Sequence, residues 1–519
     1  MGAYLGLDSS TQSLSAILID TEKGEILVDE SVNYGRDLPE YNCPNGALPN
    51  SDPLVQHADP LLWVAALDLL LRRLSDAGAP LGRVEGISGS GQQHGSVYLD
   101  GSFQDVLRGL SNERCLADQI GPSLTRKTAP IWMDSSTGQQ CEELTQAIGD
   151  RLQRDTGSPA VERFTGPQIR RFYQTDPELY ARTARIHLVS SFLCCVLCGE
   201  EAPIDHGDGA GMNLMNLKTL DWDAEIAAAT APDLLSKLPP LAPSATPAGT
   251  LSPYFEQYGL RAGIPVVCWS GDNPNSLIGT GAARPGTAVI SLGTSDTFFG
   301  AMEAPVVDPN GYGHVFGNPA GGFMSLICFK NGSLAREAVK EQCGVDWKSF
   351  DNTAFEETPA GNGGNMMLPY FEPEITPLVM QAGVRRRGED AFCREEAPAA
   401  VVIRAVVESQ ALAMRLHSEW MGGGFETLRV TGGASKSPGL CRVLSDVFQA
   451  RLEKISVANS AGLGAAIRAA QGTGGETWDG MARRFSAPVE TVEPLPENAD
   501  VYERMVEQFR DFEASALQA

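Results

Sequence analysis

Two short segments, about half the chain apart, share one pattern and constrain the fold more than any other feature. In residues 4–13 and 289–297, a run of apolar residues leads into a loop of glycine, hydroxyl and carboxylate side chains, and a second β-rich run follows. Glycine lets a ligand approach the backbone closely, and Ser and Thr hydroxyls add hydrogen-bond donors. Either segment alone would be interpreted as an ordinary β-hairpin. The repeated pair predicts a phosphate held between two related domains.

The length and charge of the chain narrow the class of protein. A chain of 519 residues is too long for one hydrophobic core, so two large domains are predicted. Its 65 acidic residues against 40 basic ones give a formal charge of −25, which argues against nucleic acid or an anionic membrane as the main partner. A phosphorylated ligand would have to be bound locally, by backbone amides and Mg²⁺.

The cysteines and the N-terminus bear on the location of the protein. Eleven cysteines form no spaced framework, which predicts reduced thiols and a cytoplasmic protein. The Cys195 and Cys198 spacing is compatible with a redox or metal site, but it falls in an apolar run predicted to be a buried helix, so core packing is the favoured role. No signal peptide and no apolar run of membrane-spanning length is expected.

Local patterns predict alternating strands and helices in both halves of the chain. A β-meander is expected over residues 1–35, surface loops at 361–364 and 385–396, and a domain boundary near 282–286. Further strands are predicted at 84–88, 266–269, 288–292, 298–301 and 428–430, and helices at 61–74, 186–197, 400–421 and 439–448. The strand at 84–88 leads into a polar loop at 89–95.

Asp272 is the strongest candidate for a catalytic carboxylate. It ends a short apolar strand, follows Gly271 and precedes Asn273 and Pro274, which favour a tight turn. A carboxylate in this place can accept the proton of a substrate hydroxyl as that hydroxyl attacks phosphorus. An Asx-turn or helix-capping role is an equally good interpretation of the local pattern.

Two further polar groups suggest ligand binding. Gln92, Gln93 and His94 form an uncharged donor and acceptor set suited to sugar hydroxyls, although a buried hydrogen-bonded loop explains them as well. Asp8 could orient the water shell of Mg²⁺, or it could only close the first turn. The chain contains no G-x-x-x-x-G-K-[ST] sequence, which disfavours a P-loop nucleotidase, and no zinc motif.

Taken together and in order, these motifs resemble those of FGGY-type carbohydrate kinases. The resemblance runs essentially from end to end and is carried by the loop after Asp8 and by the segments 91–96, 162–166, 271–274, 291–295, 329–334 and 431–435. It implies an α/β, two-domain, actin-like ATPase (ribonuclease H-like) fold. Each domain would be a mixed sheet flanked by helices, with the active site in the cleft between the domains. Residues 1–283 would form the sugar-binding domain and 284–519 the nucleotide-binding domain.

The same resemblance assigns roles to individual residues. Asp272 would be the base and would contact the sugar, together with Gln93, His94, Arg163 and Asn273. Asp8 would hold Mg²⁺ through water and the ATP phosphates. The nucleotide-binding residues would be Thr11, Gln12, Gly293, Thr294, Trp347, Gly432, Gly433 and Lys436. Lys436 stands where many relatives are expected to carry a neutral amide.

The resemblance implies phosphorylation of D-xylulose by ATP and Mg²⁺, giving D-xylulose 5-phosphate. Ribulose, gluconate or glycerol are alternative acceptors, because similar sugars differ by the orientation of one hydroxyl. An actin-like chaperone or filament protein is a more distant alternative, and it would need no sugar base. The partners expected are the sugar and ATP, and a homodimer is considered although the sequence does not specify the oligomeric state.

Overall fold

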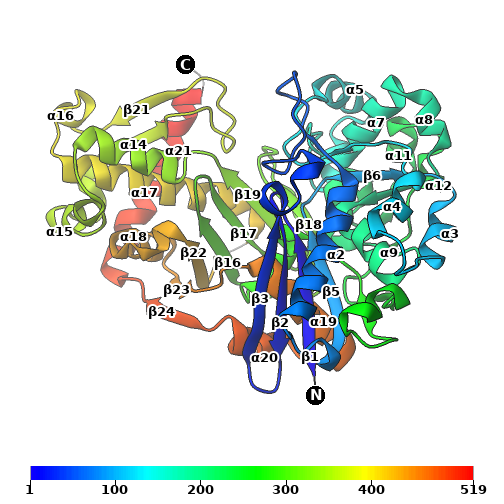
Figure 1. Ribbon diagram of the computed structural model, residues 1–519. Helices are drawn as coiled ribbons and strands as arrows, with labels where there is room; N and C mark the ends of the chain where they lie inside the picture. Colours follow the sequence, from blue (N-terminus) through cyan, green and yellow to red (C-terminus); the bar gives the residue numbers. More distant parts are fainter. Residues whose placement is uncertain (1, 423, 518–519) are drawn as a thin grey trace. The chain divides into compact units, whose positions relative to one another are not determined.

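The computed structural model describes residues 2–422 and 424–517 (Figure 1). The chain forms two compact units. The first unit comprises the chain up to Ala283 together with Val315–Met324 and Ala458–Ser486. The second unit comprises Arg284–His314, Ser325–Val457 and the chain from Ala487 onward. Two segments from later in the sequence are therefore built into the N-terminal unit.

A mixed sheet is the framework of the first unit. The predicted meander is present as three antiparallel strands, and a fourth strand lies parallel to the first. The strands are β1 (Ala3–Ser9), β2 (Ser13–Asp20), β3 (Glu25–Asn33), β5 (Val84–Gly91), β13 (Pro247–Thr250), β14 (Pro265–Val267) and β15 (Ser270–Gly271). Their order is β13-β14-β5-β1-β2-β3, and β15 also pairs with β5. All residues of β1 are buried, as expected for a central strand covered on both faces.

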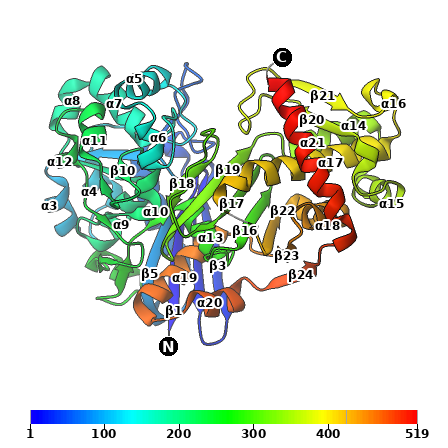
Figure 2. The ribbon, with the colours of Figure 1, turned by 180° about the vertical axis from the view of Figure 1, so that it is seen from behind.

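Helices cover both faces of this sheet. On one face, α2 (Pro60–Asp76) packs against β2 and β3 (Figure 1). On the other face, α19 (Ser460–Gly474) packs against β1 and β5, and α13 (Asp272–Gly279) packs against α19 (Figure 2). The start of α2 follows from its sequence, because Asp59 accepts a hydrogen bond from the Leu61 N–H and proline occupies the first helical position.

The cysteine-rich segment forms α9 (Val189–Cys198), in which every residue is buried. Cys194, Cys195 and Cys198 belong to the main hydrophobic core of the first unit. The described residues contain no group of three or more His, Cys, Asp or Glu side chains placed to hold a metal ion. The structure therefore agrees with a packing role for these thiols.

A second hydrophobic core supports the rest of the first unit. It lies around β6 (Ser96–Leu99), β8 (Arg185–Leu188) and α7 (Thr165–Thr175), with Tyr98 and Phe172 in ring contact. The remaining elements of the unit are α1 (Tyr34–Asp37), β4 (His57–Ala58), α3 (Phe103–Arg108), α4 (Leu116–Ile120), β7 (Ala129–Pro130), α5 (Gly138–Ile148), α6 (Arg151–Thr156), α8 (Pro177–Arg182), β9 (Ile204–Asp205), α10 (His206–Gly209), β10 (Met215–Asn216), β11 (Asp221–Trp222), α11 (Ala224–Thr230), α12 (Leu234–Lys237), β12 (Leu241–Ala242) and α20 (Trp478–Phe485).

The second unit is built on the same plan. Two antiparallel strands form a hairpin, and a third strand lies parallel to the first of them. The strands of this sheet are β16 (Thr287–Leu292), β17 (Asp296–Met302), β18 (His314–Gly317), β19 (Phe323–Phe329), β22 (Thr427–Gly432), β23 (Arg451–Ile455) and β24 (Pro488–Val492). Most of β18 and the first two residues of β19 fall in Val315–Met324, the segment counted with the first unit. Their order is β18-β19-β17-β16-β22-β23-β24. The predicted α/β fold with a mixed sheet in each of two units is confirmed.

Helices pack against one another beside this second sheet. In Figure 2, α21 crosses α17 and passes beside α18, and it contacts both helices. The helices of the unit are α14 (Ser333–Cys343), α15 (Ala354–Glu357), α16 (Asp390–Cys393), α17 (Ala399–Ser418), α18 (Pro438–Phe448) and α21 (Ala499–Leu517), and a separate hairpin is formed by β20 (Met366–Tyr370) and β21 (Gly383–Arg387).

Several local predictions need correction. The helix predicted at 186–197 begins only at Val189, because Arg185–Leu188 form β8 and pair with β6. The strand predicted at 84–88 continues to Gly91, because residues up to that point pair with both β1 and β15. The segment predicted as a surface loop at 385–396 instead contains the end of β21 and α16. No helix among the described residues is long and apolar enough to cross a membrane.

Candidate active site

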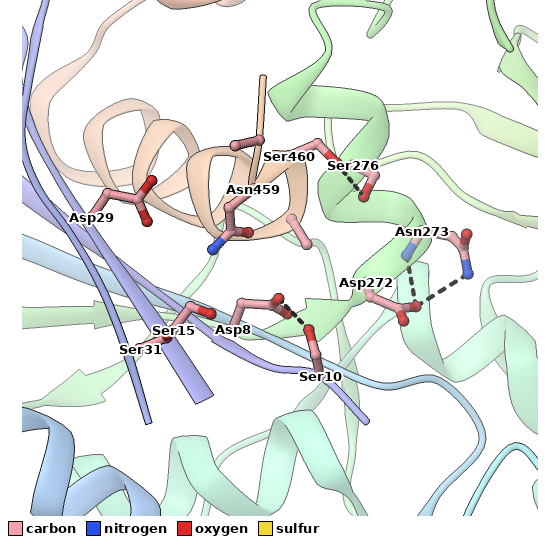
Figure 3. Close-up of a pocket in the computed structure, with 12 residues that line it drawn as sticks. Asp8, Ser10, Ser15, Asp29, Ser31, Asp272, Asn273, Ser276, Asn459 and Ser460 are labelled. Atoms are coloured by element: carbon pink, nitrogen blue, oxygen red, sulfur yellow. Dashed lines mark hydrogen bonds between the residues drawn. The ribbon is translucent and has the colours of Figure 1, made fainter. Parts of the chain in front are cut away.

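Three strand ends of the first sheet bring the predicted catalytic residues together. β5 pairs in parallel with β1 and with β15, so Asp8 lies opposite Ser90 and Ser90 lies opposite Ser270. Helix α13 begins directly after β15, and its first residue is Asp272. The carboxyl ends of parallel strands meet at one edge of a sheet, which is where α/β proteins bind ligands. Asp8 and Asp272 therefore line one pocket (Figure 3).

The pocket lies on the face of the sheet that α19 covers. Side chains alternate along a strand, so Asp8 points to the same face as Gly6. A Cβ at Gly6 would lie 2.1 Å from the backbone oxygen of Gly462, so only glycine fits against α19 here. The N-terminal end of α19 is capped by Asn459, whose side chain accepts a hydrogen bond from the Gly462 N–H at 2.8 Å. Both Asn459 and Asp8 face the pocket in Figure 3.

The pocket is polar and acidic. It has a volume of about 510 Å³, and the described residues that line it provide carboxylates, serine hydroxyls and asparagine amides but no basic side chain. The lining residues are Asp8, Ser10, Ser15, Asp29, Ser31, Asp272, Asn273, Ser276, Ala458, Asn459, Ser460 and Ala461. Phosphate groups would be repelled by these carboxylates unless a cation accompanied them.

Asp272 is not the N-cap of α13 but the first residue of the helix, and its carboxylate bonds to a backbone N–H of the first turn. Its Oδ1 accepts hydrogen bonds from the backbone N–H of Asn273 at 2.8 Å and from the Asn273 Nδ2 at 3.1 Å. The N-cap of α13 is Gly271, and no side chain caps the helix. Burial, together with the nearby Asp8 carboxylate, raises the pKa of Asp272 from 3.8 to about 7. A carboxylate with such a pKa can both take up and release a proton near neutral pH.

Asp8 is buried beside the Asp272 carboxylate. None of the described residues that contact Asp8 is basic. Its Oδ2 accepts a hydrogen bond from the Ser10 hydroxyl at 2.6 Å, and its Oδ1 has no partner of good hydrogen-bond geometry. Burial raises the pKa of Asp8, and the neighbouring Ser10 and Ser90 hydroxyls partly offset this effect. A buried carboxylate oxygen facing a polar pocket favours interaction with a hydrated cation.

Asn273 links the candidate base to the polar loop at 89–95. Its Nδ2 donates to the Gln93 Oε1 at 2.8 Å as well as to Asp272. Gln93 is 3% exposed, so its amide is held inside the first unit. The structure thus brings Gln93, Asn273 and Asp272 together, and Gln92 is also buried in the same loop.

His94 is held in one orientation and in its neutral form. Its backbone has a φ of 69°, and its ring stacks on Phe164 with the centroids 4.2 Å apart. The Nδ1 lies 2.8 Å from the carbonyl oxygen of Gly211, which can only accept, so Nδ1 carries the proton and Nε2 is an acceptor. Burial and the charge of Arg163 lower the pKa of His94 to about 3. A neutral acceptor of this kind suits a sugar hydroxyl.

Arg163 lies next to His94 through an intervening ring. Its guanidinium carbon is 5.7 Å from the centroid of the Phe164 ring on which His94 stacks. Thr11 and Gln12 lie in the turn between β1 and β2, outside the set of residues that line the pocket. The Thr11 hydroxyl accepts a hydrogen bond from the Trp132 Nε1 at 2.8 Å.

The remaining predicted site residues belong to the second unit. Gly293 and Thr294 form the turn between β16 and β17, and their carbonyl oxygens accept hydrogen bonds from the N–H groups of Ser333 and Leu334 at 2.9 and 3.5 Å. These bonds connect the turn to the start of α14, and the N–H groups of Gly293 and Thr294 are not used in them.

Gly432 and Gly433 end β22 and begin a short turn before α18. Gly432 has a φ of 94°, and a Cβ there would lie 2.3 Å from the backbone oxygen of Leu292. A Cβ at Gly433 would meet no atom within 4 Å. Gly432 is therefore required by the fold, whereas the space at Gly433 is open to a ligand.

Lys436 and Trp347 are both exposed. Lys436 is the last residue of the turn Gly433–Lys436. Trp347 is 43% exposed and packs edge-on against Phe350, with its centroid 5.3 Å from that ring. The Lys340 Nζ lies 5.3 Å above the Trp347 ring. The indole is thus an accessible flat surface in the second unit.

Comparison with known proteins identifies the family. The N-terminal domain of the FGGY family of carbohydrate kinases matches residues 3–279, and the C-terminal domain of that family matches residues 288–472. The chain belongs to the FGGY family of carbohydrate kinases. It is 40% identical over 489 residues to xylulose kinase 2 of Arabidopsis thaliana, covering 90% of this chain and 87% of the relative.

Two more FGGY proteins extend the comparison. The chain is 38% identical over 525 residues to xylulose kinase of Rattus norvegicus, covering 99% of this chain and 97% of the relative. The crystal structure of xylulose kinase from Rhodospirillum rubrum superposes with a TM-score of 0.82 at 21% identity, covering 99% of this chain and 98% of that one, which establishes the shared fold.

Several pocket residues of this FGGY kinase were not predicted from the sequence. Asn459 and Ser460 start α19, and Ser15, Asp29 and Ser31 come from β2 and β3. Asn followed by Ser, Ala and Gly is a recognisable helix start, so the cap itself could have been found. Its place in the pocket depends on the packing of α19 against β1, which no local pattern records.

Proposed function

We propose that this FGGY kinase transfers the γ-phosphoryl group of ATP to D-xylulose and forms D-xylulose 5-phosphate. The observation that carries the proposal is Asp272, a carboxylate with a pKa of about 7 that faces a polar pocket beside Asp8. The choice of sugar is supported by relatives named xylulose kinase, which are 38–40% identical over 90–99% of the chain.

In this proposal Asp272 is the general base. It accepts the proton of the sugar hydroxyl as the hydroxyl oxygen attacks the γ-phosphorus. Asn273 holds the Oδ1 of Asp272 through its N–H and Nδ2, which leaves Oδ2 for the substrate. Gln93, the neutral Nε2 of His94, and Arg163 bind the other sugar oxygens. Since His94 stays uncharged, it accepts a hydroxyl proton in a hydrogen bond without competing with Asp272 for it.

Mg²⁺ fits the residues that are present. The pocket has carboxylates and no basic side chain, and Asp8 offers a buried oxygen without a good partner. Since the described residues lack a direct multi-ligand metal cluster, Asp8 would hold the ion through water, with the ATP phosphates supplying other oxygens. When bound, Mg²⁺ neutralises phosphate charge that the pocket alone would repel.

We also propose which part of the chain binds the sugar and which part binds the nucleotide. Residues 1–283 bind the sugar and 284–519 bind the nucleotide. The N–H groups of Gly293 and Thr294 approach the γ-phosphate, and the first turn, with Thr11 and Gln12, contributes on the phosphate side. Gly432, Gly433 and Lys436 line the adenosine site, and the exposed indole of Trp347 lies near adenine. A homodimer and a cytoplasmic location remain predictions.

The test is a coupled assay of ADP release with purified protein and a panel of sugars. D-xylulose should exceed D-ribulose, L-ribulose, glycerol and gluconate in kcat/KM by at least about tenfold, roughly the effect of one buried hydrogen bond left unpaired. A higher kcat/KM with ribulose, gluconate or glycerol would overturn the choice of sugar and leave the kinase chemistry standing. ADP release that no sugar stimulates would contradict the proposal as a whole.

A further inference from the structure

A buried arginine lies behind the turn that carries Asp272. Arg468 belongs to α19 and is 1% exposed. Its Nη2 donates to the carbonyl oxygens of Cys268 at 2.6 Å and Ser244 at 2.8 Å, and its Nη1 donates to the Asn275 Oδ1 at 3.2 Å and the Gly89 carbonyl at 3.4 Å. The Arg468 side chain therefore binds β5, α13 and the residues between β14 and β15 at once.

Asn275 extends these contacts to the residue before the proposed base. It is fully buried, and its Nδ2 donates to the carbonyl oxygen of Gly271 at 2.9 Å and to that of Gly89 at 3.3 Å. Gly271 has no side chain but pairs with Gly91 through β15, and the Asp272 carboxylate accepts hydrogen bonds from Asn273 and from the Gln93 backbone. Asn275, which Arg468 in turn holds, therefore adds a side-chain bond to the backbone that carries Asp272, in addition to the pairing of β15 with β5.

We propose that Asn275 and Arg468 are positioning residues that keep Asp272 aligned with the attacking hydroxyl. This inference rests on the proposed role of Asp272 as the base. Misplacing a catalytic group by about 1 Å can lower a rate roughly 100-fold. Neither Asn275 nor Arg468 lines the pocket, so both would act indirectly, and the Asn275 bond to the Gly271 carbonyl connects them to Asp272.

The first experiment compares two alanine variants at the two ends of α13. Asn275→Ala removes the donor to the Gly271 carbonyl beside Asp272, and Ser486→Ala removes the donor to the Gly279 carbonyl at the far end, a bond of 2.7 Å. Both remove a buried side-chain bond to the same helix. Asn275→Ala should lower kcat about 10- to 100-fold with sugar and ATP KM values within about twofold, whereas Ser486→Ala should keep kcat within about twofold. Equal kcat values for the two variants would overturn the proposal.

If Asn275→Ala does not fold, Asn275→Asp can be tested instead, because aspartate has the same size as asparagine and adds a charge. Asn275→Asp fills the same space and still accepts from Arg468, but it cannot donate to Gly271. Its added charge would raise the pKa of Asp272, so kcat is compared on the high-pH plateau. A loss of about tenfold or more on that plateau supports the proposal. A plateau kcat equal to that of the wild type contradicts it.

A double-mutant cycle tests whether the effect passes through the base. In an Asp272→Asn background, Asn275→Ala should change the residual kcat by less than about twofold, because the base that it positions is already absent. A full additional loss would show that Asn275 acts elsewhere. The cycle uses whichever sugar the wild type phosphorylates best, so a wrong sugar assignment does not affect it. Wild-type protein without sugar-dependent ADP release would overturn the proposed function and this inference together.

Discussion

The two hairpins that the sequence analysis paired, β1–β2 and β16–β17, each carry a buried aspartate but use it differently. Asp8 stands near the end of β1, beside a pocket, and its Oδ1 has no well-formed partner. Asp296 opens β17, and its two carboxylate oxygens accept hydrogen bonds from the Arg336 guanidinium at 2.7 and 2.9 Å. Arg336 also donates to the Gln410 Oε1 at 2.8 Å.

The Asp296 carboxylate therefore stabilises the fold, whereas Asp8 is the carboxylate that we propose interacts with a ligand. In the second unit the Asp296 charge is neutralised inside the protein, and the turn at Gly293 and Thr294 is held through its carbonyl oxygens, which leaves out the N–H groups that we propose approach the γ-phosphate. In the first unit burial raises the pKa of Asp8, which costs stability and leaves the carboxylate available to a cation. The two hairpins thus share one strand arrangement, but the aspartate is paired with Arg336 in the second unit and faces a pocket in the first.

The largest effect should follow from removing the proposed base, Asp272, in the first unit. Asp272→Asn keeps the size of the side chain and its acceptor for Asn273 but cannot accept a proton. We expect kcat to fall by about two to four orders of magnitude, the usual contribution of a positioned general base. Steady-state ADP release measures kcat, and isothermal titration with sugar should show binding largely retained. Near-normal turnover would return Asp272 to a purely structural role.

Matched asparagine variants of the two hairpin aspartates should separate stability from catalysis. Asp296→Asn leaves the buried Arg336 guanidinium without its charge partner and should cost about 3–5 kcal/mol of stability, as is typical when one member of a buried ion pair is removed. Asp8→Asn should lower kcat about 10- to 100-fold through weaker Mg²⁺ binding. Thermal unfolding and Mg²⁺ titrations of kcat measure the two effects.

The sign of the Asp8 stability effect can be derived from its pKa. The folded state binds the proton of Asp8 more tightly than the unfolded chain, so the charged form destabilises the protein as pH rises above the ordinary value of 3.8. Asp8→Asn should therefore unfold at the same temperature as the wild type or higher at neutral pH. If Asp8→Asn were less stable than Asp296→Asn, the contrast between the two hairpins would be wrong.

The pH dependence of the reaction should show the influence of Asp8 on Asp272. The base must be deprotonated to work, so kcat/KM for the sugar should fall about tenfold for each pH unit below the Asp272 pKa of about 7. Asp8 contributes to raising that pKa, and Asp8→Asn should move the acidic limb to lower pH. An acidic limb at the same pH in both proteins would show that the two carboxylates do not interact.

Local pattern predicted much of the fold but only part of the site. The meander, α2, β16 and α18 follow from apolar periodicity and caps, which act within a few residues. Asp272 and the polar loop with Gln93 were found because each ends a strand. Asn459 and Ser460 were missed because they reach the pocket only through the packing of α19 on Gly6. Whether Asp272 caps its helix could not be decided from sequence either, because it depends on which N–H its carboxylate meets.

The smallest predicted effect concerns the nucleotide side and compares two adjacent glycines. A Cβ at Gly433 meets nothing within 4 Å, whereas one at Gly432 collides with the Leu292 backbone at a φ of 94°. Gly433→Val should therefore fold normally and raise the ATP KM about tenfold, because the branched side chain blocks close approach of the nucleotide, while the sugar KM stays within about twofold. Gly432→Val should lose thermal stability first. Equal increases in both KM values for Gly433→Val, at unchanged stability, would place the adenosine site elsewhere in the second unit.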